Sequence, residues 1–155
     1  MASTSLRVED YTIAWICALP VEMAAATAML DDRHDQLSRP SHDDNIYTFG
    51  SIGPHNIILA CLPAGVTGTA SAAIVATKLL STFTSIKFGF MVGVGGGVPS
   101  STADIRLGDV VVSKPSGTSG EVIQYDFGKT TREGQFVRTG SLNKCRPGLV
   151  LVILS

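Results

Sequence analysis

The stretch Ile13-Ala14-Trp15-Ile16-Cys17-Ala18-Leu19-Pro20-Val21-Glu22 combines an apolar run, a tight turn and the start of a helix. The run from Tyr11 to Leu19 is rich in β-branched, aromatic and aliphatic residues, which predicts a buried strand. Pro20 suits the first turn of a helix, and the segment from Val21 to Leu30 supplies good helix formers. This order places the Glu22 carboxylate at the carboxyl end of a strand, where open α/β sheets bind their ligands.

Further strands and one more helix are expected downstream. Ile46–Ile52 and Asn56–Leu62, separated by Gly53-Pro54-His55, have the pattern of a β-hairpin. A helix capped by Thr69 is expected next, because apolar residues recur there at helical spacing. Its expected buried face consists of Ala72, Ala76, Leu79, Leu80 and Phe83. Lys87–Val94 and Val110–Val112 read as strands, and strands alternating with helices favour an α/β fold with a central sheet.

Two polar segments and one apolar end complete the chain. Residues 31–45 are expected to form a surface loop, in which His34 and His42 are solvated. Residues 113–148 are polar and dotted with glycine, and no regular structure is predicted for them. The apolar run at 148–155 fits either a final inner strand or an unpaired strand that would promote aggregation.

Composition limits the function classes. A chain of 155 residues fits one domain, and its formal charge of −1 predicts neither a nucleic-acid groove nor an anionic membrane surface. No apolar stretch reaches the roughly 18–20 residues of a membrane span. The three cysteines, Cys17, Cys61 and Cys145, are widely spaced, which predicts reduced thiols in a cytoplasmic protein and no metal site. Residues 1–10 are expected to be a flexible lead-in.

The glycine cluster Gly93-Val94-Gly95-Gly96-Gly97 follows a predicted strand. Two interpretations stay open: a tight turn with close backbone packing, or a loop whose N–H groups face a ligand. A dinucleotide fingerprint would need a third glycine where Val98 stands and a helix after it, so a Rossmann dehydrogenase is rejected. A P-loop lacks its Gly-Lys-Ser/Thr.

Glu22 also has two interpretations. A glutamate in the first turn of a helix commonly does no more than interact favourably with the helix dipole. The loops at 63–68 and 93–98, however, also follow predicted strands, and all three could converge at one edge of the sheet. That convergence would make Glu22 a member of a ligand site.

Several segments in one order resemble the purine and uridine phosphorylase family, which includes the methylthioadenosine/S-adenosylhomocysteine nucleosidases. They are Ala18-Leu19-Pro20-Val21-Glu22, Ala64-Gly65-Val66, Val92-Gly93-Val94-Gly95-Gly96-Gly97-Val98 and Arg106-Leu107-Gly108-Asp109-Val110-Val111-Val112-Ser113. Residues 16–23, 108–115 and 124–129 more specifically resemble fungal nucleoside-phosphorylase-like domains, which are often fused to nucleotide-binding and repeat regions. The resemblance covers residues 11–143, as the amino-terminal part of such a domain, and leaves 144–155 as a divergent apolar tail.

The resemblance implies a three-layer fold with a central mixed sheet flanked by helices and incomplete at its carboxyl end. It implies cleavage of the N-glycosidic bond of purine nucleosides by a homo-oligomer without a cofactor, using water or phosphate as co-substrate. The position of Glu22 separates the two chemistries: in nucleosidases an acidic residue there orients or deprotonates water, whereas hexameric bacterial phosphorylases hold phosphate with an arginine. Hydrolysis with Glu22 as base is therefore preferred. The residues expected to line the substrate are Ala64, Gly65, Val66, Thr67, Val94, Gly95 and Gly96.

Two departures from the family pattern keep a third hypothesis open. Val94 stands where the nucleosidase motif has a serine that helps to hold the water. The family's ribose-binding Met-Glu pair and its base-protonating acidic residue have no match after Asn143. A module that senses a nucleoside or a partner without turnover is thus the alternative to an enzyme.

Overall fold

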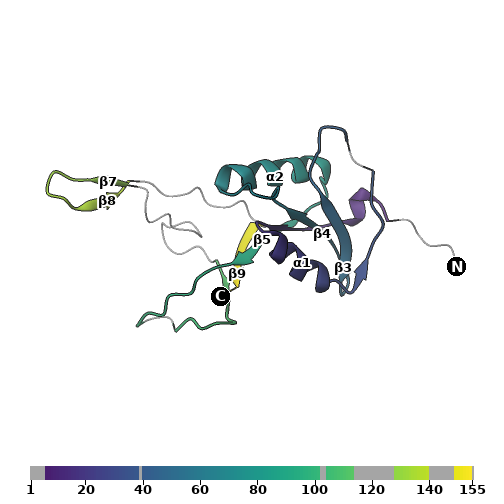
Figure 1. The fold of residues 1–155 in the computed structure, drawn as a ribbon. Coiled ribbons are helices and arrows are strands. Elements are labelled where there is room, and N and C mark those ends of the chain that lie inside the picture. The colour runs from purple at the N-terminus through teal and green to yellow at the C-terminus, as the bar shows by residue number, and fades with distance from the viewer. Residues whose placement is uncertain (1–5, 39, 102–103, 114–127, 140–148, 155) are drawn as a thin grey trace.

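The computed structural model describes residues 6–38, 40–101, 104–113, 128–139 and 149–154. Its larger sheet contains seven strands in the order β2-β3-β4-β1-β5-β9-β6 (Figure 1). A second sheet pairs β7 with β8. The elements are a 3-10 turn at Val8–Asp10, β1 Ile13–Cys17, α1 Pro20–Ala28, β2 Asp32–Arg33, β3 Tyr47–Ile52, β4 His55–Cys61, α2 Thr69–Thr82, β5 Phe88–Val94, β6 Val110–Val112, β7 Gly128–Thr130, β8 Phe136–Arg138 and β9 Leu149–Leu154.

The large sheet is mixed. Strand β1 lies parallel to both β4 and β5, and β5 lies parallel to β9, whereas β2–β3, β3–β4 and β6–β9 are antiparallel pairs. Neighbouring parallel strands end at the same edge, since Cys17 pairs with Cys61 and Ile16 with Met91. The expected α/β class with a central mixed sheet is confirmed.

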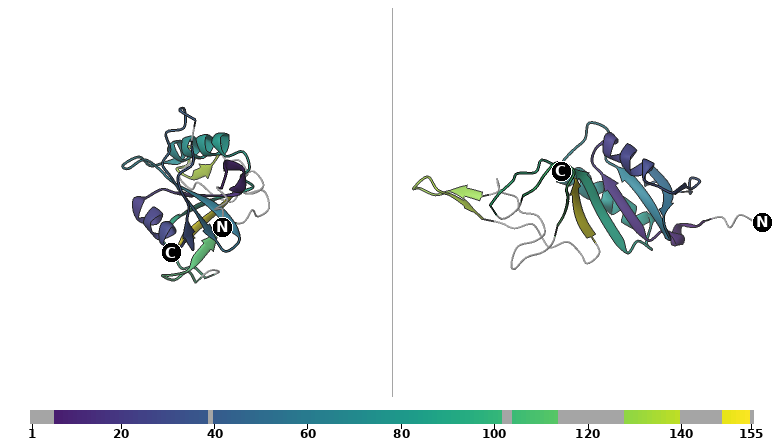
Figure 2. Two further views of the ribbon diagram at one scale, coloured as in Figure 1. Left: turned by 90° about the vertical axis from the view of Figure 1, so that its right-hand side faces the viewer. Right: turned by 90° about the horizontal axis from the view of Figure 1, so that it is seen from below.

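The two helices cover opposite faces of the sheet, as Figure 2 shows. Helix α2 packs through Val75 and Leu79 on the face that carries Ala14 and Ile58. Helix α1 packs through Ala26 on the other face, in a second cluster. Because neighbouring residues of a strand point to opposite faces, β1 and β4 contribute to both clusters, and they form the buried centre of three layers.

Most predicted elements are present, but helix α2 differs in two details. The expected cap at Thr69 is wrong, because Thr69 is itself helical, Gly68 precedes it with a φ of 97°, and no side chain caps the helix. Leu80 was expected on the buried face, yet it is 49% exposed. Val75 takes its place in the core, since the buried stripe is centred between Val75 and Leu79.

The segment 31–45 is not only a surface loop. Asp32–Arg33 forms the short edge strand β2, and Asp43 and Asn45 are buried. The expectation that His34 is solvated is wrong: it is half-buried, and its Nδ1 lies 2.8 Å from the Tyr11 hydroxyl. His42 is exposed, as expected.

Both terminal segments of the sequence contribute to the fold through their described residues. Leu6 and Val8, within the predicted lead-in, pack against the larger core cluster, while residues 1–5 lie outside the described part. Residues 149–154 form β9, between β5 and β6, which is the inner-strand alternative for the apolar end. Part of the polar segment at 113–148 forms the β7–β8 ladder, and the rest of it, including Tyr125, Asp126 and Cys145, lies outside the described residues.

Candidate functional site

Glu22 occupies the third position of helix α1, whose N-cap residue is Leu19. Its Oε2 accepts hydrogen bonds from the backbone N–H groups of Ala18 and Leu19, each at 2.9 Å. A glutamate at this position commonly reaches back to free N–H groups at the start of a helix, and Pro20 has no N–H that needs a partner. The local sequence therefore fixes one side of the carboxylate.

The other carboxylate oxygen reaches across the sheet edge. Glu22 Oε1 accepts a hydrogen bond from the backbone N–H of Val94, at 2.9 Å and 72 residues further along the chain. The carboxylate thus joins the turn after β1 to the end of β5. This contact brings together two of the residues that the sequence predicted for the site.

The number of acceptor positions on the Glu22 carboxylate limits how many further hydrogen bonds it can accept. An ionised carboxylate has about four lone-pair positions. Among the described residues, two N–H groups occupy Oε2 and one occupies Oε1, so one position on Oε1 remains. Glu22 is half-buried, which leaves it within reach of solvent. It can therefore accept one more hydrogen bond, from a water molecule or a ligand hydroxyl.

A small hollow of about 130 Å³ lies beside this carboxylate. It is lined mainly by apolar side chains of α1 and by the end of β5. Trp15 also lines it, and its indole Nε1 is buried. The lining residues are Trp15, Val21, Glu22, Ala25, Ala26, Met29, Val92, Gly93 and Val94.

The loop after β4 begins at the same sheet edge. The N–H of Leu62 donates to the carbonyl oxygen of Cys17 at 3.0 Å, which ties the start of this loop to the end of β1. Gly65 and Gly68 have φ values of 78° and 97°. Side chains disfavour this left-handed region, so the path of the loop depends on its glycines.

A larger cavity of about 530 Å³ lies between this loop, the start of α1 and helix α2. Its volume is within the range of small-molecule sites. Two predicted substrate residues, Ala64 and Val66, line it, whereas Glu22 does not. The complete lining is Pro20, Met23, Asp44, Asn45, Ile46, Cys61, Leu62, Pro63, Ala64, Val66, Ser71, Ile74, Val75 and Lys78.

The predicted site residues therefore fall into three groups. Glu22 and Val94 are in direct contact. Ala64 and Val66 share the larger cavity with Pro20 and Met23 of α1. Gly65, Thr67, Gly95 and Gly96 line neither hollow, and of these only Gly95 is half-buried.

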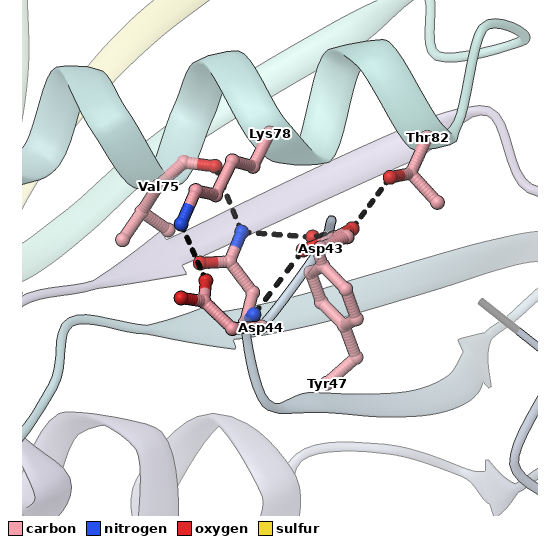
Figure 3. A network of polar contacts seen from close by, with 7 residues as sticks. Asp43, Asp44, Tyr47, Val75, Lys78 and Thr82 are labelled. Carbon is pink, nitrogen blue, oxygen red and sulfur yellow. Dashed lines mark hydrogen bonds and ion pairs between the residues drawn. The ribbon is translucent and has the colours of Figure 1, made fainter. Parts of the chain in front are cut away.

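A buried polar network beside the larger cavity joins the loop before β3 to helix α2 (Figure 3). Asp43 Oδ2 accepts hydrogen bonds from the Tyr47 hydroxyl at 2.8 Å and the Thr82 hydroxyl at 2.5 Å, and its Oδ1 accepts one from the Asn45 N–H. The Asn45 side-chain amide donates to the Val75 carbonyl oxygen and to the Tyr47 hydroxyl oxygen. Because its carboxylate is engaged by these partners, Asp43 serves as a structural anchor.

Neither described cysteine has the environment of a nucleophile. Burial raises the pKa of Cys17 to about 12 and also raises that of Cys61, and both thiols are free. A reactive cysteine needs the opposite shift. Within the described residues no group of three or more His, Cys, Asp or Glu side chains could hold a metal ion. Nor does any helix in that part of the chain have the length and apolar character to cross a membrane.

Gly93, a member of the glycine cluster, approaches Glu22 in a way that the sequence did not predict. A Cβ atom at Gly93 would lie 2.9 Å from Glu22 Oε1. The sequence signal was the presence of Gly89 and Gly93 inside the otherwise apolar strand 88–94, since a missing side chain in a strand often marks a close approach. The group that approaches Gly93 comes from a distant part of the chain and could not be read from the strand itself.

Comparisons with known proteins place these features in a family. A nucleotide-binding leucine-rich repeat (NLR)-like protein of Hyaloscypha variabilis is 53% identical over 140 residues, which cover 90% of this chain and 14% of that protein. A Borrelia burgdorferi protein crystallised with adenine matches at a TM-score of 0.55 and 20% identity, over 66% of this chain and 41% of that one. The 5'-methylthioadenosine/S-adenosylhomocysteine nucleosidase of Colwellia psychrerythraea, in complex with adenine, matches at 0.50 and 22%, over 67% and 38%.

The two solved structures support the fold. The chain spans about two fifths of the length of each of them and about a seventh of the length of the fungal relative. The family model described as the phosphorylase superfamily matches residues 12–151. This range contains β1, α1, the loop after β4, α2 and β5, and with them Glu22 and its partner Val94. The chain belongs to the phosphorylase superfamily.

Proposed function

We propose that the chain contributes the nucleophile side of a site that cleaves the N-glycosidic bond of a purine nucleoside, with water as the nucleophile. The observation that carries this proposal is the Glu22 carboxylate, which is held by three backbone N–H groups and has one acceptor position left. A carboxylate in that state can orient a single water molecule. The adenine-bound relatives favour a purine as the leaving base.

The reaction assigns a definite task to Glu22. As the bond between C1' of the ribose and the base nitrogen breaks, positive charge develops on the ribose, and the enzyme must stabilise that charge. Water adds to C1' and gives up a proton, which Glu22 Oε1 accepts, while the base leaves with a proton supplied from elsewhere. The negative charge of Glu22 also favours the cationic ribose electrostatically.

The loops that follow β4 and β5 are proposed to line the sugar. Val94 is the last residue of β5, and Gly95 and Gly96 follow it. The Ala64–Thr67 segment follows β4, which ends at the same edge of the sheet. Backbone atoms at these positions, rather than long side chains, would contact the ribose. The proposal names no residue of this chain as the acid that protonates the leaving base. It therefore concerns turnover by the whole protein.

Phosphate is the alternative nucleophile, and one contact disfavours it. The N–H of Val94, the last residue of β5 before the glycine-rich loop, donates to Glu22. A phosphate dianion on this loop would lie near a carboxylate, and the two negative charges repel each other. Water carries no such penalty.

Release of the base from adenosine and inosine, measured with and without phosphate, tests the proposal. We expect turnover in phosphate-free buffer that is lost in Glu22→Gln and retained in the control Glu133→Gln, whose side chain is exposed in the β7–β8 turn. Strict dependence on phosphate would assign the site to a phosphorylase. Nucleoside binding without turnover would favour the sensing module, with a homo-oligomer or a fused domain as its partner.

A further inference from the structure

We infer that Gly93 is a positioning residue for Glu22: the missing side chain at Gly93 lets the carboxylate reach the Val94 amide. Its consequence for catalysis rests on the proposed function, but the positioning itself can be tested without turnover. The first constraint is steric. A Cβ atom at position 93 would lie 2.9 Å from Glu22 Oε1, 3.4 Å from its Cδ and 3.5 Å from its Oε2.

The pairing of β5 resists a movement of its backbone that would relieve such a contact. Gly93 lies within β5, where it pairs with Ile153 of β9, and on the other side of the strand the ladder with β1 extends as far as Met91. A strand with neighbours on both sides is held by two ladders of hydrogen bonds. The strand therefore stays in place, and the group that must move is the end of the Glu22 side chain.

Moving that side chain has a specific cost. Oε2 is held by the N–H groups of Ala18 and Leu19 within its own helix turn, so the carboxylate would pivot about Oε2. Oε1 would then leave the Val94 N–H, and its free acceptor position would point elsewhere. The fold persists, while the geometry of the proposed nucleophile site changes.

The chain offers a matched control in the same glycine cluster. A Cβ atom at Gly96 would meet nothing within 4 Å, and Gly96 has no left-handed φ. Gly93→Ala and Gly96→Ala therefore make the same chemical change three residues apart, and only the first should displace the carboxylate.

Hydrogen exchange and the chemical shift of the Val94 amide, recorded by NMR on the full chain, test the positioning directly. We expect Gly93→Ala and Glu22→Ala each to move the Val94 resonance and speed its exchange by about tenfold or more, the effect of losing roughly 1.4 kcal/mol of hydrogen bonding. Gly96→Ala should keep the exchange rate of the unaltered chain. A Val94 amide that stays equally protected in Gly93→Ala would overturn the inference.

Turnover separates this inference from the proposed function. With Glu22 as base, Gly93→Ala should lower kcat on the order of ten- to a hundredfold with KM nearly unchanged, because misplacing a reacting group by about 1 Å costs rate. If Glu22→Gln abolishes turnover while Gly93→Ala turns over like the unaltered protein, the positioning is wrong and the function stands. If Glu22→Gln turns over normally, the function is wrong, and the Val94 amide still decides the positioning.

Discussion

Glu22 and Val94 lie 72 residues apart in the sequence, yet Glu22 Oε1 accepts the Val94 N–H at a distance of 2.9 Å. The contact crosses from the first turn of α1 to the last residue of β5. It gives one carboxylate two roles, because Oε2 completes the start of the helix while Oε1 fixes the helix to the glycine-rich loop. Helix capping and site formation are therefore not alternatives at this residue.

The two roles predict a graded loss of stability at position 22. Glu22→Ala removes the acceptor of three backbone N–H groups. We expect a loss of about 1–2 kcal/mol, typical of a lost helix cap, because water can reach this half-buried site and replace part of the bonding. Glu22→Gln keeps one oxygen acceptor and should lose less. Urea unfolding of both variants measures the order, and equal losses would contradict the account.

The buried carboxylate of Asp43 should matter far more to stability than its exposed neighbour. Asp43→Ala leaves the buried Tyr47 hydroxyl and the half-buried Thr82 hydroxyl without this acceptor, and we expect a loss of about 3 kcal/mol. Asp44→Ala removes only an exposed ion pair with Lys78, so the change should be small. Thermal unfolding of the two variants makes the comparison, and similar midpoints would show that the network of Figure 3 is not an anchor.

Helix α2 provides a second matched pair. Leu79 is fully buried and Leu80 is 49% exposed. Leu79→Ala should lower the free energy of unfolding by about 2–5 kcal/mol, as buried leucines do, while Leu80→Ala should lower it by less than about 1 kcal/mol. Denaturant titration distinguishes the two. A larger loss at Leu80 would restore the buried face that the sequence pattern predicted.

Tyr11 predicts how stability changes at alkaline pH. Burial raises its pKa from 10.0 to about 12, so the unfolded chain loses the phenolic proton first as the pH rises. The stabilisation is complete below pH 10 and is lost as the pH rises toward 12. Unfolding of Tyr11→Phe should therefore depend less steeply on pH across this window than unfolding of the unaltered chain. Parallel slopes would show that Tyr11 is not the titrating group.

Much of the fold could be predicted because it is encoded locally. The apolar run at 13–17, the hairpin across Gly53 and the helix formers after Pro20 each specify one element with its neighbours alone. The order of strands in the sheet and the inner position of β9 depend on contacts between distant segments. Helical periodicity alone likewise assigned Leu80 to the buried face of α2, because the spacing of apolar residues does not show where the centre of that face lies.

The candidate site could be predicted only in part, for the same reason. Glu22 was found from its place after a strand, and Val94 from the glycine cluster, but their hydrogen bond needed the sheet to be assembled. The role of Gly93 followed only from the distance between its position and a carboxylate from another element. Asp43 was assigned to a solvated loop because its partners, Tyr47 and Thr82, come from β3 and α2.

The central claim is that Glu22 serves a water nucleophile, and one measurement tests it most directly. Base release from adenosine in phosphate-free buffer is compared between the unaltered whole protein and its Glu22→Gln variant. The account predicts turnover that falls by at least about a hundredfold in the variant, within the range commonly attributed to a general base. Turnover that requires phosphate, or that persists unchanged in Glu22→Gln, would contradict it.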